Sequence, residues 1–393
     1  MTKPWVLGSN IELPQHTHTS TPTHPHPISL LLANWLSLRT FYADIAGSNP
    51  VGSTIFVIVN KALPDLLNQP SSMSHTLQQI PIFDALKTSQ NILLAGAGGG
   101  FDIFSGIPLY FSLKKQGKKV ILGNLSFTWL HESSSENVFP FCYKIRIGDS
   151  DLSGRNYFPE RYLKLWLSLQ GENPDVYAFE RIGVNPLKEA FQYLIEKHNI
   201  DTVILIDGGT DSLMFGDEEG LGTPQEDICS MAAVYQTGIP KQFLISVGFG
   251  VDHYHGVSHY RFLENVAELI KTGGYLGLFQ ITKEMEEAQK YLEAIQFANE
   301  RMRGMESIVS NSIASALEGE YGDHHKTRRT QGSQLWINPL MTIYWCFDLS
   351  KVVEKIKYYD WIKDVNTIGE FNGKLARYQS SLSEFRQGWQ LPI

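Results

Sequence analysis

The fold follows from the stretch Asn91-Ile-Leu-Leu-Ala-Gly-Ala-Gly-Gly-Gly-Phe-Asp102. Its apolar first half has the length of a strand, its glycines are typical of a turn, and residues 103–116 are compatible with a helix. Glycine lacks a Cβ, so the backbone can adopt positive φ and let a ligand approach, and the helix that follows presents unpaired N–H groups. The stretch therefore predicts a strand, a turn and a helix that bind a phosphate or carboxylate; a tight structural turn is the alternative.

Short apolar runs alternate with amphipathic segments along the rest of the chain. Strands are predicted at residues 119–123, 141–147, 176–179, 201–206, 242–247 and 341–346, and helices at residues 161–169, 186–197, 225–235, 260–271, 284–303 and 306–317. Strands that alternate with helices of about ten to fifteen residues indicate βαβ units and a parallel sheet. We therefore predict an α/β fold, with a Rossmann-like, doubly wound, mainly parallel sheet, helices on both of its faces and a helical C-terminal part.

Three segments are expected along the chain. Residues 1–72 include four histidines interleaved with Thr and Pro between positions 16 and 26, a low-complexity pattern that buries no apolar face. We expect these residues to be a disordered or spurious N-terminal extension, with translation starting at Met73. The Rossmann-like α/β domain is predicted at residues 73–349 and a helical segment at residues 350–393.

The composition of the chain limits the kinds of partner that it is expected to bind. The 393 residues are 42% hydrophobic, enough for a large core, and their formal net charge of -8 gives no general attraction to nucleic acid or anionic membranes. No apolar run reaches the roughly 18 residues that span a bilayer. Cys142, Cys229 and Cys346 are widely spaced, which argues against disulfides and thiolate zinc sites and favours a cytoplasmic location. We expect a phosphorylated small molecule as partner, no nucleic acid and no membrane, and an oligomer is as compatible with the sequence as a monomer.

Two further loops combine glycine with aspartate after a predicted strand. They are Ile206-Asp-Gly-Gly-Thr-Asp211 and Gly248-Phe-Gly-Val-Asp-His253. The carboxyl ends of parallel strands share one edge of the sheet, and ligands bind there where the strand order reverses. We therefore expect the three loops to converge on one pocket. The glycines expected to approach the ligand are Gly98, Gly99, Gly100, Gly208, Gly209, Gly248 and Gly250.

The aspartates of these loops lie beside glycines that are expected to bind an anion, and this combination requires an explanation. They would repel a phosphate unless a divalent cation lay between them, and Mg²⁺ prefers carboxylate and phosphate oxygens. We expect Asp207 and Asp211 to bind Mg²⁺ and Asp102 to line the ligand. Contact with a ribose hydroxyl without a metal, and capping of the next helix by Asp102, are the alternatives. The acids of residues 217–227 would extend the metal site, bind a basic substrate or form a solvated loop.

The third loop continues into a histidine-rich stretch. Histidine can bind a metal, or act as a general acid or base near neutral pH. We assign Asp252, His253 and His255 as candidate catalytic residues, and solvated loop histidines are the alternative. Further along, Arg328 or Arg329 could bind a phosphate through a bidentate guanidinium contact, or could lie in a surface loop.

These motifs resemble those of the archaeal and bacterial Domain of Unknown Function family 1152. The resemblance rests on Gly98-Gly-Gly-Phe-Asp102, on the Gly-Gly-Thr-Asp segment that leads into the acidic run before Pro224, and on Gly248-Phe-Gly-Val-Asp252. It covers about residues 80–348 and departs from the family pattern at His253, where a glycine is usual, and in the extra N-terminus. The resemblance implies a Rossmann-like fold and brings no established activity.

The combined loops predict a function class. We expect an enzyme that binds a nucleotide or another phosphorylated small molecule and carries out Mg²⁺-dependent hydrolysis or group transfer. NAD-type dinucleotide binding without a divalent ion is one alternative. A non-catalytic sensor module that only holds its ligand is the other.

Overall fold

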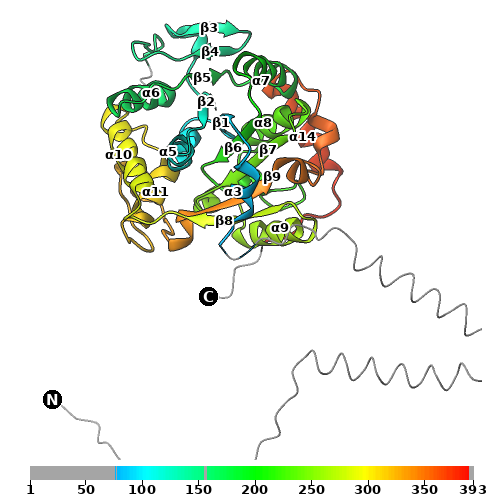
Figure 1. The fold of residues 1–393 in the computed structure, drawn as a ribbon. Helices are drawn as coiled ribbons and strands as arrows, with labels where there is room; N and C mark the ends of the chain where they lie inside the picture. The colour runs from blue at the N-terminus through cyan, green and yellow to red at the C-terminus, as the bar shows by residue number, and fades with distance from the viewer. Residues whose placement is uncertain (1–75, 77, 155–156, 389–393) are drawn as a thin grey trace, which may run out of the picture. The chain divides into compact units, whose positions relative to one another are not determined.

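The sheet at the centre of the structure has nine strands in the order β3-β4-β5-β2-β1-β6-β7-β9-β8 (Figure 1). The structure is a computed structural model that describes residues 76, 78–154 and 157–388. The parallel strands are β1 (Asn91–Gly96), β2 (Lys119–Leu125), β5 (Val176–Phe179), β6 (Thr202–Asp207) and β7 (Lys241–Ser246). The antiparallel strands at the two edges are β3 (Glu136–Phe139), β4 (Cys142–Lys144), β8 (Tyr275–Gln280) and β9 (Ile343–Asp348).

Strand β1 occupies the middle of the parallel part because its side chains are apolar on both faces. Ile92 and Leu94 belong to one hydrophobic core, whereas Leu93 and Ala95 belong to another, and all four are fully buried. Successive side chains of a strand point to opposite faces, so such a strand requires a layer of helices on each side. The order of the parallel strands reverses at β1, because β2 and β5 extend the sheet on one side and β6 and β7 on the other.

Helices cover both faces of this sheet (Figure 1). The core that contains Ile92 is closed by α3 (Pro81–Leu86), α5 (Ile107–Lys115), α6 (Pro159–Leu169), α10 (Glu286–Arg301) and α11 (Ile308–Leu317). The core that contains Leu93 is closed by α7 (Val184–His198), α8 (Pro224–Gln236), α9 (His259–Lys271), α12 (Leu349–Val353), α13 (Tyr359–Ile362) and α14 (Ile368–Ser381). The C-terminal helices therefore share a core with α7 and α8.

The α/β class is confirmed, but three local elements differ from the sequence prediction. The helix predicted at residues 103–116 is divided at Gly106 into α4 (Asp102–Ser105) and α5, whose first turn contains Pro108, a residue without an N–H donor. The strand predicted at residues 141–147 is one arm of the antiparallel β3–β4 hairpin. Strand β8 was not predicted at all, because it is a short edge strand whose residues are half-buried or exposed.

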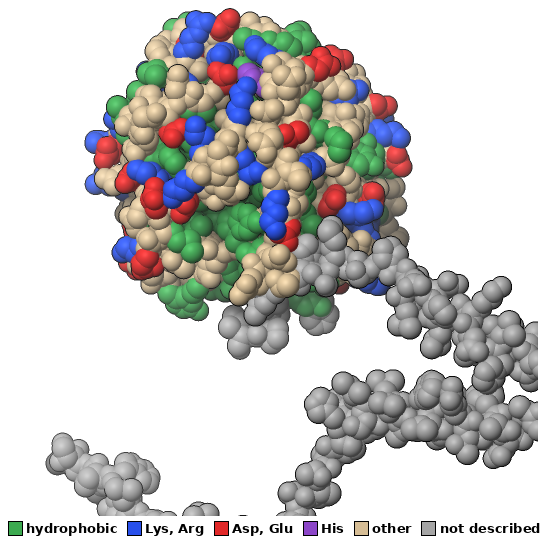
Figure 2. Space-filling model, in the orientation of Figure 1, with side chains coloured by type: hydrophobic (Ala, Val, Ile, Leu, Met, Phe, Trp, Pro, Cys, Tyr) green, Lys and Arg blue, Asp and Glu red, His purple; other side chains and the backbone are tan. Residues whose placement is uncertain are grey.

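The described surface shows no gathering of charge on the face that is drawn. On the face drawn in Figure 2, acidic and basic side chains are interspersed rather than gathered by sign. No helix in the described part of the chain is both long enough and apolar enough to cross a bilayer. The N-terminal extension expected at residues 1–72 lies outside the described residues.

Candidate metal centre

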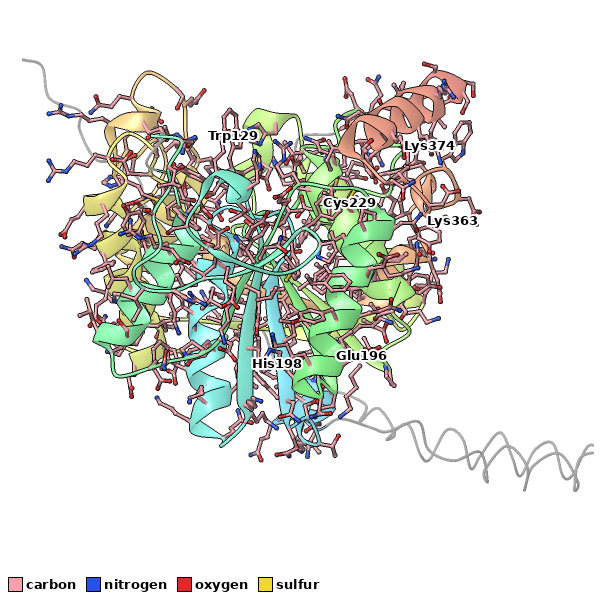
Figure 3. The ribbon with its side chains drawn as sticks, turned by 90° about the horizontal axis from the view of Figure 1, so that it is seen from above. Trp129, Glu196, His198, Cys229, Lys363 and Lys374 are labelled. Atoms are coloured by element: carbon pink, nitrogen blue, oxygen red, sulfur yellow. The ribbon has the colours of Figure 1, made fainter. Side chains whose placement is uncertain are left out.

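The three loops of glycine and aspartate meet at the carboxyl edge of the sheet. Thr210, in the loop after β6, donates its N–H (2.6 Å) and its hydroxyl (3.2 Å) to Asp252 Oδ2, in the loop after β7. Asp102, in the loop after β1, accepts the N–H of Gly208. Trp129, which follows β2, marks this edge in Figure 3. The strand order thus brings together loops that are far apart in the sequence.

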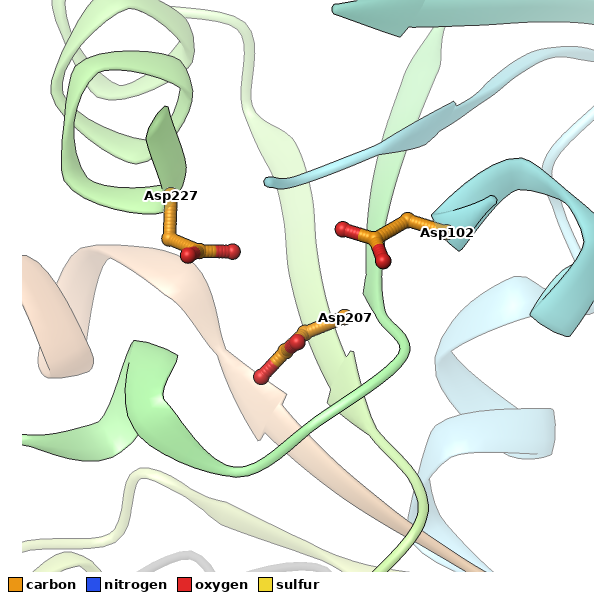
Figure 4. Close-up of side chains that lie close together, drawn as sticks. All are labelled: Asp102, Asp207 and Asp227. Carbon is orange, nitrogen blue, oxygen red and sulfur yellow. The ribbon is translucent and has the colours of Figure 1, made fainter. Parts of the chain in front are cut away.

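Three aspartates from different elements bring their carboxylates together at this edge (Figure 4). Asp102 is the first residue of α4, Asp207 is the last residue of β6, and Asp227 lies in the first turn of α8. One oxygen from each lies within 4.8 Å of the others. Mg²⁺ binds oxygens at about 2.1 Å in an octahedron, which places neighbouring ligands about 3 Å apart and opposite ligands about 4.2 Å apart. Small side-chain rotations would therefore let all three bind one ion.

Asp227 is the member of this group that sequence analysis did not single out. It lies in a helix rather than directly after a strand, and its only signal is the acidic run of residues 217–227 that it ends. Its side chain is 3% exposed, and its Oδ1 has no hydrogen-bond partner among the described residues. A buried carboxylate oxygen without a partner is unfavourable. This atom therefore indicates a ligand that the described protein atoms do not supply.

The glycine turn after β1 binds its own aspartate. The N–H groups of Gly98 and Gly99 donate to Asp102 Oδ2 at 2.7 and 3.0 Å. The N–H of Gly100 donates to the carbonyl of Leu125 at 3.0 Å. The phosphate cradle expected at these three glycines is therefore already occupied by protein acceptors. A sequence cannot distinguish an N–H group that faces a ligand from one that faces a side chain.

Asp207 and Asp211 are oriented by hydroxyl and amide donors. Asp207 Oδ2 accepts the hydroxyl of Ser212 at 2.5 Å, and Asp211 Oδ2 accepts the N–H and the hydroxyl of Thr223 at 2.8 and 3.0 Å. The other oxygen of each, Oδ1, faces Gly209, at 3.0 and 3.3 Å from the position that a Cβ would take there. Donors that fix one oxygen and leave the other available are typical of the residues around a metal.

Carboxylate oxygens lie close to three of the predicted glycine positions. A Cβ on Gly98 would lie 2.7 Å from Asp227 Oδ1, and a Cβ on Gly209 would lie 2.8 Å from Asp252 Oδ2. A Cβ on Gly208 would likewise lie 3.0 Å from a carboxylate oxygen. Each distance is shorter than a van der Waals contact, so a side chain at any of these positions would displace an aspartate.

The glycines after β7 have a different explanation. Gly248 and Gly250 have φ values of 93° and 87°, in the left-handed region that favours glycine. A Cβ on Gly250 would lie 2.9 Å from the ring of Trp336, and one on Gly248 would face the side chains of Val309 and Ile313. Backbone conformation and apolar packing account for both glycines, and the ligand contact expected of them stays a prediction.

The histidines lie outside the carboxylate group. His253 and His255 belong to the 3₁₀ turn η3 (Val251–His255) and are exposed, while Asp252 in the same turn is 6% exposed. The group of described residues that could hold a metal contains no imidazole. Of the three predicted catalytic residues, the structure therefore brings only Asp252 to the other aspartates. Arg329 Nη1 donates to the carbonyl of Glu306 at 2.5 Å. Burial raises the pKa of Tyr157, whose hydroxyl faces Gly100, and the charge of Arg329 opposes that rise, so Arg329 lies near the glycine turn.

Burial and mutual repulsion raise the pKa of four of these carboxyl groups. Asp102 is partly exposed as a residue, but its carboxylate is buried. This burial raises the pKa of Asp102 to about 7, although the N–H donors of the glycine turn act to lower it. Burial, followed by the negative charge of Asp211, raises the pKa of Asp207, Asp227 and Asp252 well above the usual range. In the described ranges, no Lys or Arg forms an ion pair with any of the five aspartates.

These residues fit a divalent cation. Buried carboxylates without a counter-charge must be neutralised by protons or by a cation. Oxygen-only donors are the ligands that Mg²⁺ and Mn²⁺ prefer. Protonation alone would neutralise part of the charge. It would still leave Asp227 Oδ1 without a hydrogen-bond partner among the described residues. Asp102, Asp207 and Asp227 would hold the ion, with Asp211 and Asp252 beside them.

Comparison with known proteins gives one match. A family model described as "Protein of unknown function (DUF1152)" matches residues 170–384. The matched range includes Asp207, Asp211, Asp227 and Asp252, and it begins after Asp102. No curated protein and no solved structure matches the chain.

Proposed function

The chain belongs to the DUF1152 family of proteins of unknown function, and from its aspartate centre we propose that it is a metal-dependent enzyme acting on a nucleotide or another phosphorylated small molecule. The observation that carries the proposal is the buried, unpartnered Oδ1 of Asp227 within a group of three carboxylates. Mg²⁺ between carboxylate and phosphate oxygens is the usual arrangement of phosphoryl-transfer sites. Hydrolysis or transfer of a phosphoryl group is the proposed reaction class.

The position of the centre in the sheet supports this proposal. We infer a Rossmann-like, doubly wound sheet from the order β5-β2-β1-β6-β7, which reverses at β1. Ligands of such sheets bind at the carboxyl edge beside the point of reversal. Asp102 and Asp207 follow β1 and β6, the two strands that flank this point. The three cysteines are free and buried, which supports the cytoplasmic location that we also propose.

The proposed mechanism assigns each aspartate a task. Asp102, Asp207 and Asp227 hold the cation, which when bound would stabilise charge on phosphoryl oxygens and lower the pKa of water. Asp252 lies across Gly209 from Asp207, and its carboxylate would take the proton that an attacking water or hydroxyl group releases. Passage of that proton through His253 or His255 to solvent stays a prediction.

The proposal is tested by phosphate release from a panel of nucleotides and sugar phosphates incubated with the full chain and Mg²⁺. We expect release that EDTA abolishes. Asp227→Asn should lower it by more than about 100-fold, because loss of a ligand exceeds the roughly 10- to 100-fold effect of the residues that support ligands. Asp360→Asn, which alters an exposed aspartate paired with Lys363, is the control and should keep full activity.

Isothermal titration of the same compounds, with Mg²⁺ and with EDTA, distinguishes the alternatives. A bound dinucleotide that resists EDTA would support NAD-type binding, although the N–H groups of Gly98 and Gly99 already donate to Asp102. Mg²⁺-dependent binding without turnover of any panel member would support a sensor module. Neither binding nor turnover would refute the proposed function.

A further inference from the structure

Arg181 contacts the first turn of α8, the element that supplies Asp227 to the aspartate centre. Its Nη2 donates to Glu226 Oε1, and Glu226 immediately precedes Asp227 in the first turn of α8. Its Cζ lies 5.1 Å from the centroid of the Phe127 ring. Arg181 follows the carboxyl end of β5, so it lies at the same edge of the sheet as the metal-binding loops.

The two neighbours of this guanidinium, Phe127 and Glu226, adjoin elements that supply the aspartates. The Phe127 ring lies against the glycine turn, with two ring carbons 2.9 and 3.0 Å from the position of a Cβ on Gly100. Gly98, in the same turn, faces Asp227 Oδ1 at 2.7 Å from its own Cβ position. Arg181 therefore contacts one residue of the first turn of α8 and one residue that packs against the glycine turn, the two elements that supply Asp227 and Asp102 to the metal centre.

The ion pair leaves most of the donors of Arg181 unused. A guanidinium has five N–H donors, and a structural pair with a carboxylate commonly uses two of them in parallel. Here Nη2 is the one atom of Arg181 that donates to Glu226 among the described contacts, and the Glu226 side chain also accepts from Gln225. The Arg181 side chain is 43% exposed. It is oriented by Glu226 and Phe127 but keeps donors that face solvent.

We propose that Arg181 binds the phosphate group of the substrate beside the metal. This inference rests on the proposed function, because a phosphate beside the metal would lie between the guanidinium and a cation held by Asp102 and Asp227. Five aspartates would repel such an anion unless positive charge came from both sides. The planar fork of arginine matches two phosphate oxygens, which lysine does not. The substrate class is therefore a phosphate monoester or phosphoanhydride with an accessible terminal phosphate.

The test uses isothermal titration of the full chain, first with Mn²⁺ alone and then with inorganic phosphate in saturating Mg²⁺. Arg181→Ala should weaken phosphate binding by about 10- to 100-fold, the effect of losing hydrogen bonds to a charged group. Its Mn²⁺ affinity should stay within about threefold of wild type, because Arg181 contributes no metal ligand. Arg181→Lys should recover only part of the phosphate affinity.

Arg301→Ala is the matched control, since Arg301 also lies over an aromatic ring, that of Phe297, and beside a glutamate, Glu300. It should change neither titration. If Arg181→Ala fails to fold, Arg181→Lys, which keeps the charge next to Glu226, decides the matter through its loss of phosphate affinity.

The failures of the two proposals can be distinguished. A wild-type chain that binds no Mn²⁺ removes the proposed function and this inference with it. A chain that binds Mn²⁺ but binds phosphate no better than its Arg181 variants, or binds no phosphate, overturns the role of Arg181 and leaves the metal centre intact.

Discussion

Two buried acids in this protein, Glu218 and Asp227, have nearly the same exposure and opposite surroundings. Glu218 is 1% exposed and accepts hydrogen bonds from the N–H groups of Phe215 and Gly216, the amide of Asn265 and the guanidinium of Arg386. Asp227 is 3% exposed, its Oδ1 has no partner in the part of the chain that the structure describes, and its neighbours are other acids. A buried acid with its own donors stabilises a fold, whereas one without them indicates a missing ligand.

The largest effect is expected from removing the acid that has partners. Glu218→Ala should lower the free energy of unfolding by about 3–5 kcal/mol, because the buried N–H groups of Phe215 and Gly216 would be left without their acceptor, while Arg386 would keep Asp217 and Glu264. Urea unfolding of the metal-free protein measures this loss. Glu354→Ala, at an exposed pair with Lys351, should change stability by less than about 1 kcal/mol. Equal losses in the two variants would mean that the Glu218 contacts are not structural.

Replacing Asp227, whose Oδ1 has no partner among the described residues, should have the opposite effect on stability. Asp227→Asn neutralises one member of a group of repelling carboxylates, so the metal-free protein should become more stable by about 1 kcal/mol. The same change should weaken Mn²⁺ binding by more than about 100-fold. Urea unfolding and isothermal titration give the two values. If the variant were less stable and still bound Mn²⁺, Asp227 would be a structural acid like Glu218 rather than a metal ligand.

The pH dependence of stability should sharpen the contrast further. The pKa of Asp102 is raised from 3.8 to about 7, so between these values the folded protein holds a proton that the unfolded chain has lost. Stability from this group is therefore complete below about pH 4 and is lost as the pH rises through about 7. In EDTA, the melting temperature should fall from pH 5 to pH 8, and less steeply in Asp227→Asn. Saturating Mn²⁺ should remove most of the fall, because metal binding favours the ionised carboxylates. Equal slopes with and without Mn²⁺ would argue against the centre.

The smallest effect is expected from a residue that only orients a ligand. Ser212→Ala removes the hydroxyl that donates to Asp207 Oδ2 at 2.5 Å. Mn²⁺ affinity should fall by about tenfold, in line with other outer-shell changes, and the free energy of unfolding by about 1 kcal/mol. Isothermal titration should show this partial loss, and an unchanged affinity would mean that Ser212 does not orient Asp207 for a metal.

Much of the site could be predicted because its residues follow strands. The stretch that ends at Asp102 and the loop that contains Asp207 each place an acid and glycines directly after an apolar run, and parallel strands bring such loops to one edge. Asp227 could not be predicted in this way, since it lies in a helix and only folding of α8 turns it toward the other two. Strand β8 was missed for a related reason, because an edge strand has too little burial to show a clear pattern.

The predicted role of the glycines shows a second limit. Sequence indicates where a Cβ is absent but not what fills its place. At Gly98 and Gly209 the occupants are carboxylates of the protein, and at Gly250 the occupant is the ring of Trp336. The glycines therefore make room for the acids, and the acids rather than the glycine N–H groups are the candidates to meet a ligand.

The most direct test of the aspartate centre is a crystal structure of the full chain grown with Mn²⁺ and measured at the manganese absorption edge. We predict an anomalous peak within about 2.3 Å of one oxygen each from Asp102, Asp207 and Asp227. A well-ordered centre with no peak at these three carboxylates, at Mn²⁺ concentrations that saturate other Mn²⁺ enzymes, would contradict the account.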